Sequence, residues 1–402
     1  MSEAPPSPPA PRSAPVPEIG GRCDPRFAAV RDAFAANFAQ HGEVGAAVTV
    51  VVEGRVVVDL WGGLADPARG TPWREDTLVN VFSVTKALVT ICALRLVEEG
   101  RLGLDEPLAR AWPGFAAAGK EGVTLRQVLA HRAGLPAIRA PLPEGAMLEW
   151  ATMTRALERQ APWWPPGTQH GYHVNTFGFL VGEAVRRASG TSIGTFLRDV
   201  ITGPLGADVH LGVPRSEHAR IATFLWNATL PFPRTDPTML PDAQALRYCA
   251  YLNPPGLSGE DGWVNRPEWR LAEIPSANGH ATARGVARVY AALVAALRHG
   301  RALDGVHVLA RETLEQAIVE HSSGMDLILE RPSRFGLGFQ LTQAERPLGP
   351  NPRAFGHFGS GGALGFCDPD ADVALGYVMN DMGPRWQNPR NRALLDAVYA
   401  SL

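Results

Sequence analysis

Strand-forming sequence lies near both ends of this chain, and helix-forming sequence lies between them. Residues 44–63 (VGAAVTVVVEGRVVVDLWGG) are two β-rich runs separated by Glu53-Gly54, which predicts a hairpin. Residues 356–368 and 372–380 predict a second hairpin, joined by a Pro-Asp-Ala turn. One sheet built from both chain ends, with a helical insertion between them, is the economical arrangement for this pattern.

Apolar residues recur at helical spacing in several segments between and beside these hairpins. The predicted helices are 24–39, 83–99, 124–130, 148–160, 177–188, 281–298 and 388–402. Residues 223–275 are rich in Pro, Trp and Asn and have little periodicity; loops of that length usually shape a binding site. The proline-rich residues 1–22 predict a flexible tail.

The composition indicates a globular protein and excludes several partners. Hydrophobic residues make up 45% of the chain, which suffices for a sizeable core. Lys+Arg 38 against Asp+Glu 40 offers no basic surface for nucleic acid or an anionic membrane. No apolar run reaches the roughly 18 residues of a membrane helix, and the N-terminus does not resemble a secretory signal. We therefore expect a cytoplasmic protein with four reduced cysteines.

Neither a metal nor a cofactor has motif support. His170 and His173 are not accompanied by HExxH or a comparable ligand cluster. The sequence contains no P-loop and no GxGxxG. We expect chemistry that uses side chains alone.

Lysine is rare in this chain, since Lys86 and Lys120 are the only two among 38 basic residues. Arg can replace Lys nearly everywhere except where an amine must lose its proton. Lys86 follows Ser83 by three residues at the start of the predicted helix 83–99, so the two side chains share one face. A desolvated amine near the positive helix end could act as the base for Ser83. The alternative is that Ser83 only caps the helix and Lys86 is solvated.

A second serine lies in a literal G-x-S-x-G sequence, Gly190 to Gly194. In an α/β-hydrolase such a serine occupies a strand-to-helix elbow, but the segment before Gly190 is helical here. We expect Gly190 to end one helix and Thr191 or Ser192 to cap the next. Ser192 is therefore predicted to be structural.

The third candidate is the glycine-rich segment 355–365 (FGHFGSGGALG). Glycine within a strand often marks a close approach to the backbone. Free N–H groups on such a strand could form half of an oxyanion hole, and the alternative is a simple glycine-rich turn.

Together these segments resemble the serine β-lactamase and penicillin-binding-protein superfamily, and within it the class C-like branch that contains the family VIII carboxylesterases. FSVTKAL is similar to the nucleophile helix, and GRLGLDEPLARAWPGF and VTLRQVLAHRAGLP to the next two blocks. PPGTQHGYHVNTFGFLVGEAVRRASG is similar to the block around the catalytic tyrosine. SANGHATARGVARVYAAL and FGHFGSGGALGFCDPDADVALGYVMN resemble the C-terminal blocks of the esterase branch.

The resemblance implies an α/β (α+β) serine β-lactamase-like fold. Its sheet domain would comprise residues 23–110 and 276–402, and a mostly helical domain, 111–275, would be inserted between them. The active-site cleft would lie at their junction, where small-molecule sites are common. His131 would have a structural role.

The resemblance also implies a role for individual residues. Ser83 would be the acylated nucleophile, Lys86 its general base, and Tyr172 a second base and acid. The backbone N–H groups of Ser83 and Ser360 would form the oxyanion hole. The third family motif, Lys-Thr-Gly, falls on His357-Phe358-Gly359, which implies substrate contacts by His357 and Gly359.

Two positions depart from the lactamase pattern. Val174 occupies the place of the asparagine two residues after the tyrosine, with Asn175 one residue late, and His357 replaces the lysine of Lys-Thr-Gly. Both changes affect the wall that would contact substrate, and both argue against efficient β-lactam or D-Ala-D-Ala chemistry. An uncharged ester fits better.

We therefore expect a carboxylesterase that acts on small esters through an acyl-enzyme at Ser83. The main alternative is an acyltransferase that passes the same acyl group to an alcohol or amine. A β-lactamase or D,D-peptidase is a further alternative, as is a non-catalytic scaffold, which would tend to lose the nucleophile or its base. The sequence leaves the natural substrate and the oligomeric state open.

Overall fold

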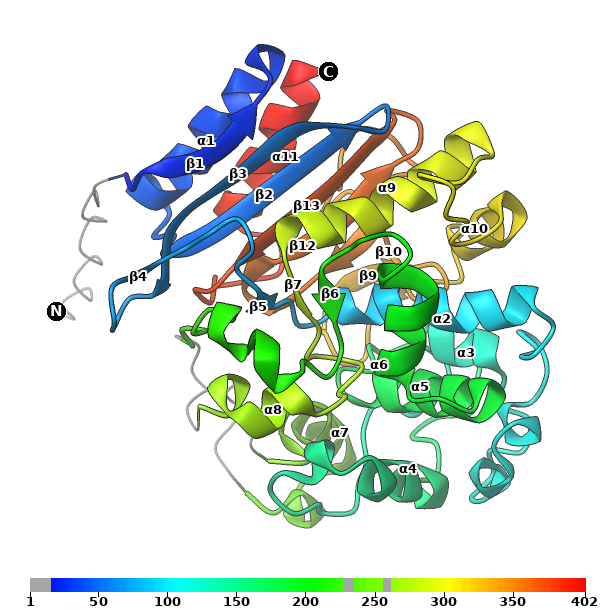
Figure 1. The fold of residues 1–402 in the computed structure, drawn as a ribbon. Helices are drawn as coiled ribbons and strands as arrows, with labels where there is room; N and C mark the ends of the chain where they lie inside the picture. Colours follow the sequence, from blue (N-terminus) through cyan, green and yellow to red (C-terminus); the bar gives the residue numbers. More distant parts are fainter. Residues whose placement is uncertain (1–15, 227–234, 256–261) are drawn as a thin grey trace, which may run out of the picture.

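The protein is described by a computed structural model that covers residues 16–226, 235–255 and 262–402 (Figure 1). Its main sheet has the strand order β1-β3-β2-β13-β12-β11-β10-β9-β8, with β4 beside β3, and neighbouring strands run antiparallel. A small sheet has the order β5-β7-β6. The strands are β1 Ile19–Cys23, β2 Gly45–Val52, β3 Arg55–Asp66, β4 Thr71–Pro72, β5 Val79–Asn80, β6 Val209–His210, β7 His280–Ala281, β8 Ser322–Met325, β9 Pro332–Phe335, β10 Gln340–Leu341, β11 Phe355–Phe358, β12 Leu364–Asp368 and β13 Val373–Met379.

The two ends of the chain meet in the middle of the main sheet. Strand β2 pairs with β13 over its whole length, from Ala46 opposite Met379 to Val52 opposite Val373. The first hairpin, β2-β3, turns at Glu53-Gly54 as predicted. The expectation of one antiparallel sheet built from both ends, in a mixed α/β fold, is therefore confirmed.

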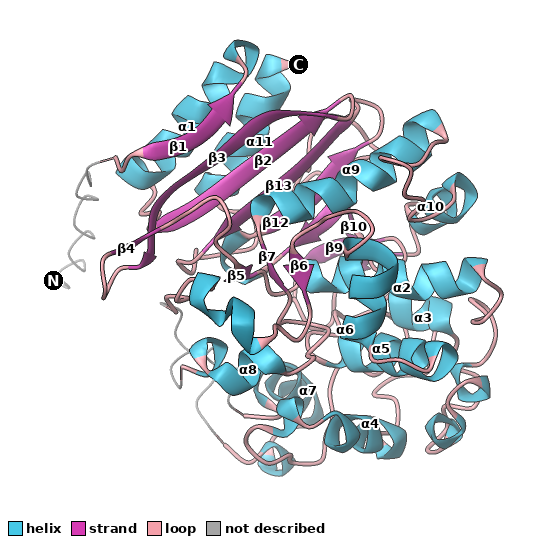
Figure 2. Ribbon diagram, in the orientation of Figure 1, coloured by secondary structure: helices cyan, strands magenta, loops and turns pink. Residues whose placement is uncertain are grey.

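Helices cover both faces of this sheet (Figure 2). The helices are α1 Ala28–Gln40, α2 Val84–Glu98, α3 Leu125–Leu129, α4 Trp150–Arg159, α5 Thr176–Ser189, α6 Ile193–Phe196, α7 Asp242–Leu252, α8 Pro267–Leu271, α9 Ala283–His299, α10 Arg311–Ala317 and α11 Pro389–Ser401. On one face α9 packs closely against β12 and β13, while α1 and α11 lie together on the other (Figure 1).

A pair of glycines lets α9 approach the sheet. Gly365 of β12 and Gly376 of β13 are directly opposite each other in the register. A Cβ on Gly365 would lie 2.2 Å from the ring of Tyr290, and one on Gly376 would lie 2.2 Å from the carbonyl oxygen of Ala283. Both contacts are too short for any larger side chain.

Helix α2 lies between the main sheet and the helical region. Almost all of its residues are buried, which is typical of a helix that is apolar all round. It contacts β11 at the sheet and α5 in the helical region. Its N-terminal end follows β5, so the small sheet fixes the start of α2 relative to β7 and α9.

The predicted helices occur within a few residues of the expected bounds. Helix 24–39 is a 3-10 turn, Pro25–Phe27, followed by α1. Segments 83–99, 124–130, 148–160, 177–188, 281–298 and 388–402 contain α2, α3, α4, α5, α9 and α11. Within the described ranges, no helix combines the length and apolar character needed to cross a membrane.

The structure corrects three expectations. Residues 19–22, assigned to the flexible tail, belong to the edge strand β1, which pairs with β3; residues 1–15 of that tail lie outside the described residues. Residues 356–368 are not one strand but β11 and β12, which pair with each other around a 3-10 turn at Ser360–Gly362. The loop region 223–275 contains α7 and α8, although residues 227–234 and 256–261 lie outside the described part.

All strands of the main sheet lie either before residue 111 or after residue 276, and α3 to α8 lie between these limits. We propose the same two-part division, with the sheet domain beginning at Ile19 instead of residue 23.

Candidate active site

Ser83 lies at the N-terminal end of α2, and its side chain is largely buried. Phe82, immediately before it, has a φ angle of 46°, a left-handed conformation that is strained for an aromatic residue. The Phe82 ring is held against Phe224, with the ring centres 4.8 Å apart. This sharp change in direction presents the Ser83 side chain at the end of the helix.

Lys86 is fully buried one turn along α2 from Ser83. Its Nζ lies 3.2 Å from Ser83 Oγ and donates to the carbonyl oxygens of Val174 at 2.7 Å and Ser276 at 2.9 Å. Burial holds the pKa of Lys86 well below its usual value, which favours the neutral amine. A neutral amine has two N–H groups and one lone pair. With both N–H groups bound to carbonyls, the lone pair is left for the Ser83 proton.

Tyr172 lies beside this pair. The Lys86 Nζ is 4.9 Å from the centre of the Tyr172 ring. Among the described residues, the buried Tyr172 hydroxyl has no well-aligned hydrogen-bond partner. Burial raises the pKa of Tyr172, and the nearby Ser83 hydroxyl offsets part of that rise. Tyr172 is therefore a neutral phenol at neutral pH, and a buried hydroxyl without a partner calls for an explanation.

The Tyr172 segment is held by the neutral histidines His131 and His173. The Nδ1 of His131 accepts from the backbone N–H of His173 at 3.1 Å, and Nε2 of His173 accepts from the N–H of Leu135 at 3.2 Å. Burial lowers the pKa of both imidazoles, that of His173 to about 3. The His131 ring also packs on Tyr172 with 4.9 Å between the centres. These contacts match the structural role expected for His131.

Asp326 was not singled out in the sequence, yet it fixes Tyr172 directly. Its buried carboxylate accepts from the backbone N–H of Tyr172, with distances of 3.0 and 3.1 Å to the two oxygens. It also accepts from the N–H groups of Ile328 and Leu329 and from the hydroxyl of Ser333. Because Asp326 lies in no recognisable motif, only the tertiary structure reveals this contact.

Ser360 begins the turn between β11 and β12 and lies on the same cavity as Ser83. The backbone of Gly359 passes so close to Val81 that a Cβ would lie 2.3 Å from the Val81 carbonyl oxygen. The start of α2 and the start of this turn are therefore neighbours. The first N–H groups of a helical turn have no partner within the turn, so those of Ser83 and Ser360 are suited to bind an oxyanion.

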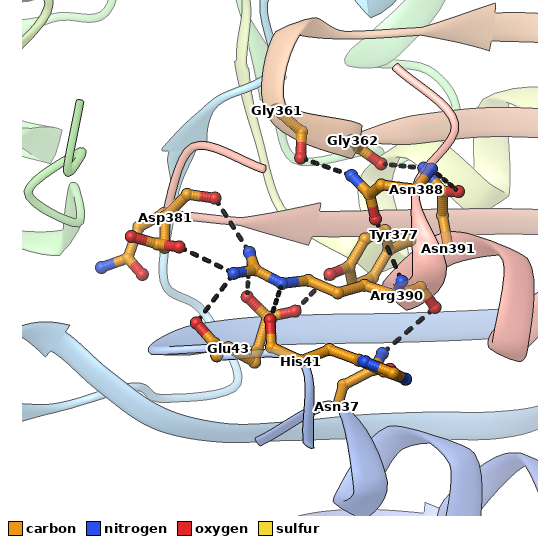
Figure 3. A network of polar contacts seen from close by, with 12 residues as sticks. Asn37, His41, Glu43, Gly361, Gly362, Tyr377, Asp381, Asn388, Arg390 and Asn391 are labelled. Carbon is orange, nitrogen blue, oxygen red and sulfur yellow. Dashed lines mark hydrogen bonds and ion pairs between the residues drawn. The ribbon is translucent and has the colours of Figure 1, made fainter. Parts of the chain in front are cut away.

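Helix α11 holds this turn from behind (Figure 3). The side-chain amide of Asn388 donates to the carbonyl oxygen of Gly361 at 2.9 Å, and that of Asn391 donates to Gly362 at 2.9 Å. Gly361 and Gly362 have φ angles of 82° and 117°, which only glycine adopts readily. The path of the turn therefore depends on both its glycines and α11.

The same helix is anchored by Arg390, which is buried under the sheet (Figure 3). Its guanidinium forms ion pairs with Glu43 at 3.2 Å and Asp381 at 2.7 Å, and it donates to the carbonyl oxygen of His41. Tyr377 of β13 also donates to Glu43. This network links α11 to the segment between α1 and β2.

A cavity of about 460 Å³ opens over these groups. Ser83, Tyr172 and Ser360 lie on its wall together with Val174 and Asn175. Aromatic side chains supply much of the remaining surface: Phe82, Trp226, Tyr251, Trp269 and Trp386. The site is therefore a mainly apolar cavity with a few convergent polar groups, as is usual for small-molecule sites.

The four residues predicted to contact substrate differ in their positions: Val174 and Asn175 line the cavity, whereas His357 and Gly359 do not. His357 is fully buried, Gly359 is buried, and neither lines the cavity, so the structure does not support direct substrate contact by either one. His357 Nδ1 bonds the carbonyl oxygen of Phe358, and burial lowers the His357 pKa to about 3. The Asn175 amide donates to the carbonyl oxygen of Ala250, while Val174 contributes its carbonyl to Lys86.

Ser192 lies elsewhere and is structural, as predicted. Gly190 ends α5 in a left-handed conformation, and the Ser192 hydroxyl caps α6 by accepting from the N–H of Thr195 at 3.2 Å. It also donates to Glu273. The G-x-S-x-G sequence is thus a pair of helix ends.

Lys120, the second lysine, is also fully buried but has a different environment. Its Nζ donates to the carbonyl oxygens of Ala117, Glu158 and Gln160 at 2.6, 2.8 and 2.7 Å. Two of these carbonyls lie at the C-terminal end of α4, where intrahelical donors are absent. Lys120 is therefore a structural cation.

The described part of the chain contains neither a disulfide nor a cluster of metal-ligand side chains. The four cysteines are free thiols. No three His, Cys, Asp or Glu side chains in those residues are grouped as a metal ion would require.

Ser83, Tyr172 and Ser360 thus meet at one cavity, with the buried Lys86 directly behind Ser83. The chain belongs to the Beta-lactamase family, whose model matches residues 30–400. The resemblance and the fold inferred from the sequence are confirmed.

Individual proteins of known name or structure are similar to this chain over most of its length. The chain is 33% identical to the esterase/beta-lactamase LipL of Mycobacterium tuberculosis, across 90% of this chain and 83% of LipL. It matches the crystal structure of a family VIII carboxylesterase with 39% identity and a TM-score of 0.85, covering 96% of this chain and all of the other. A penicillin-binding-protein homologue from Caulobacter crescentus gives 41% identity, a TM-score of 0.86 and the same coverage. The acyltransferase mokF of Monascus pilosus is 33% identical over a shorter stretch, 33% of this chain and 38% of mokF.

Proposed function

We propose that the protein is a carboxylesterase that forms an acyl-enzyme at Ser83. The observation that carries this proposal is the environment of Lys86. Two backbone carbonyls hold both N–H groups of its neutral amine, and its lone pair is left toward Ser83 Oγ at 3.2 Å. That arrangement suits a general base for a serine nucleophile.

In the acylation step, Lys86 takes the proton of Ser83 as its Oγ attacks the ester carbonyl carbon. The negative charge that develops on the carbonyl oxygen is stabilised by the N–H groups of Ser83 and Ser360, each worth roughly 3 kcal/mol in comparable sites. Tyr172, a neutral phenol, is placed to relay the proton from Lys86 to the leaving alkoxide. In deacylation, Tyr172 takes a proton from a water molecule as the water attacks the acyl-enzyme carbonyl, and Ser83 recovers its proton from Lys86.

The cavity supports a small ester as substrate. Its volume of about 460 Å³ and its aromatic wall suit an acyl group and alcohol of modest size. A β-lactamase or D,D-peptidase is less well supported, because the buried, neutral His357 replaces the cationic lysine of those enzymes. The intact set of Ser83, Lys86 and Tyr172 also argues against a non-catalytic scaffold.

An acyltransferase is the second candidate, and the similarity to mokF favours it. It would form the same acyl-enzyme and differ only in the acceptor. The free thiols support a cytoplasmic location for either activity.

The test is turnover of p-nitrophenyl butyrate by the wild type and by Ser83→Ala. Steady turnover that is lost in a folded Ser83→Ala variant supports the esterase. One burst of p-nitrophenol per enzyme, followed by turnover only when an alcohol or amine is added, favours the acyltransferase. Equal activity of the two proteins would refute the role of Ser83, and inactivity of both would favour the scaffold.

A further inference from the structure

Two arginines lie on the cavity wall without an acidic partner. Arg331 and Arg385 both line the cavity that contains Ser83. Among the described residues, neither guanidinium takes part in an ion pair. The cavity wall also contains Glu330, but its carboxylate pairs with Arg247 at 2.8 Å. In the described residues, this side of the cavity therefore has two guanidinium groups that are not held by a direct ion pair.

Arg331 is half-buried and lies close to the reacting groups. Its guanidinium carbon is 4.9 Å from the centre of the Trp386 ring, and the same ring packs edge-on against Tyr172 with 5.0 Å between centres. Trp386 thus separates Arg331 from Tyr172 by one aromatic ring. Arg385, next to Trp386 in sequence, is more exposed and stands on the same wall.

The environment of Arg331 favours an added anion. Burial lowers the pKa of Arg331, and repulsion from Arg385 lowers it further, while Tyr251 and Asp326 offset part of that lowering. Asp326, the buried carboxylate that acts on Arg331, already accepts from Tyr172, Ser333 and a neighbouring backbone N–H group. A partly desolvated guanidinium without a carboxylate is costly, and a bound anion would relieve that cost.

We propose that the substrate is an ester that carries one anionic group, a carboxylate in the simplest case, which Arg331 and Arg385 bind while the ester carbonyl lies at Ser83. The ester part of this inference rests on the proposed function. The anion would bind beside Trp386. It would lie away from the His357-Phe358-Gly359 segment, because His357 supplies no charge there. The loss of the lysine there is compatible with a charged substrate, because the charge is recognised elsewhere.

Matched ester pairs test the charge preference. The first pair, p-nitrophenyl hexanoate and mono-p-nitrophenyl adipate, differs only by a terminal carboxylate in the acyl group. The second pair, 3-methylphenyl butanoate and 3-carboxyphenyl butanoate, places the carboxylate in the alcohol. The measured quantity is the ratio of kcat/KM for the anionic ester to that for the neutral ester. We expect this ratio to fall at least about tenfold in Arg331→Gln and Arg385→Gln for one of the two pairs.

Arg198→Gln is the control, because Arg198 is an exposed arginine outside the cavity wall. Its ratio should equal that of the wild type. An unchanged ratio for both pairs in Arg331→Gln and Arg385→Gln would overturn the proposal. Because the ratio compares two esters on the same variant, a general loss of activity does not affect it.

A binding measurement on an inactive variant tests the anion site independently of the proposed esterase activity. Monohexyl adipate, titrated calorimetrically into Ser83→Ala, should bind at least about tenfold more weakly when Arg331→Gln is added. If the wild type hydrolyses no ester but this dependence on Arg331 is present, the esterase proposal fails and the anion site stands. Arg331-independent binding refutes the anion site, whatever the turnover.

Discussion

Replacing Lys86 with methionine should abolish most of the activity without weakening the fold. Methionine keeps most of the volume of the side chain and removes the amine. Loss of a positioned general base typically lowers the rate by about 10²- to 10⁴-fold. We therefore expect kcat/KM for p-nitrophenyl butyrate to fall at least about a hundredfold, or ~2.7 kcal/mol in the barrier.

The stability of the variant follows from two opposing contributions. The carbonyls of Val174 and Ser276 each lose a hydrogen bond, at about 0.5–1.5 kcal/mol apiece. Against this, the folded protein no longer buries an amine whose pKa is lowered by desolvation, and each pKa unit of that shift is about 1.4 kcal/mol. We expect the free energy of unfolding of Lys86→Met at pH 7 to be no lower than that of the wild type.

Activity and the stability of the wild type relative to Lys86→Met should both rise with pH. The folded-state pKa of Lys86 is lowered, so the unfolded chain binds the extra proton between that pKa and the usual value near 10.5. Lys86 therefore makes the wild type relatively more stable as the pH rises through this window, and its stability relative to Lys86→Met should improve. Activity should fall as acid protonates the amine, and Lys86→Met should lack that part of the pH profile.

Lys120→Met is the matched control, since it removes the other buried lysine. Three carbonyls lose a charged donor, and burial lowers the pKa of Lys120 only to about 8, so its removal should lower stability, while kcat/KM of the folded protein stays near the wild-type value. The reasoning is refuted if Lys86→Met is folded and keeps more than a tenth of the wild-type kcat/KM. It also fails if Lys120→Met, when folded, loses activity to the same extent.

Three further substitutions separate catalytic, positioning and structural roles, all measured with p-nitrophenyl butyrate. Tyr172→Phe should lower kcat at least about a hundredfold with little loss of stability, because Ser83 is the only neighbour that the hydroxyl contacts closely in the described residues; a near-normal kcat would contradict the proton relay. Asp326→Asn should lower kcat about tenfold by loosening the Tyr172 backbone, and this loss should vanish in a Tyr172→Phe background; independent effects would mean that Asp326 acts only on stability. Ser192→Ala should cost about 1 kcal/mol of stability and leave turnover nearly intact, and a hundredfold loss in a folded protein would make it a catalytic candidate again.

Local sequence signals were sufficient where a residue's neighbours in sequence are also its neighbours in space. The hairpin at Glu53-Gly54 and the helix ends at Gly190 and Ser192 follow from short-range chemistry, and the structure has them as predicted. Ser83 and Lys86 could be paired because three residues on a helix return to the same face. Tyr172 could be named only through the family resemblance.

The features that were predicted wrongly or missed depend on contacts between residues far apart in the sequence. Strand β1 is short and contains Gly20 and Gly21, so its sequence resembles a loop; a Cβ on Gly20 would lie 2.6 Å from the Trp61 ring, which is the long-range reason for the glycine. The break at Ser360–Gly362 depends on two glycines with positive φ and on amides from α11. Asp326, Arg331 and Arg385 come from loops without a motif, and they join the site only in the folded chain.

The pairing of β2 with β13 also determines when this protein can fold during its synthesis. The valine-rich strand β2 and its partner β13 are separated by some 320 residues in sequence, so the nascent β2-β3 hairpin exposes an unpaired edge until almost the whole chain has emerged. Ser83 and Lys86 are translated early, whereas Ser360 and the helix that holds its turn come last. The candidate site is therefore complete only after residues 360–401 have been made, and slower synthesis at low temperature or a chaperone that covers the β2 edge should raise the yield of folded protein.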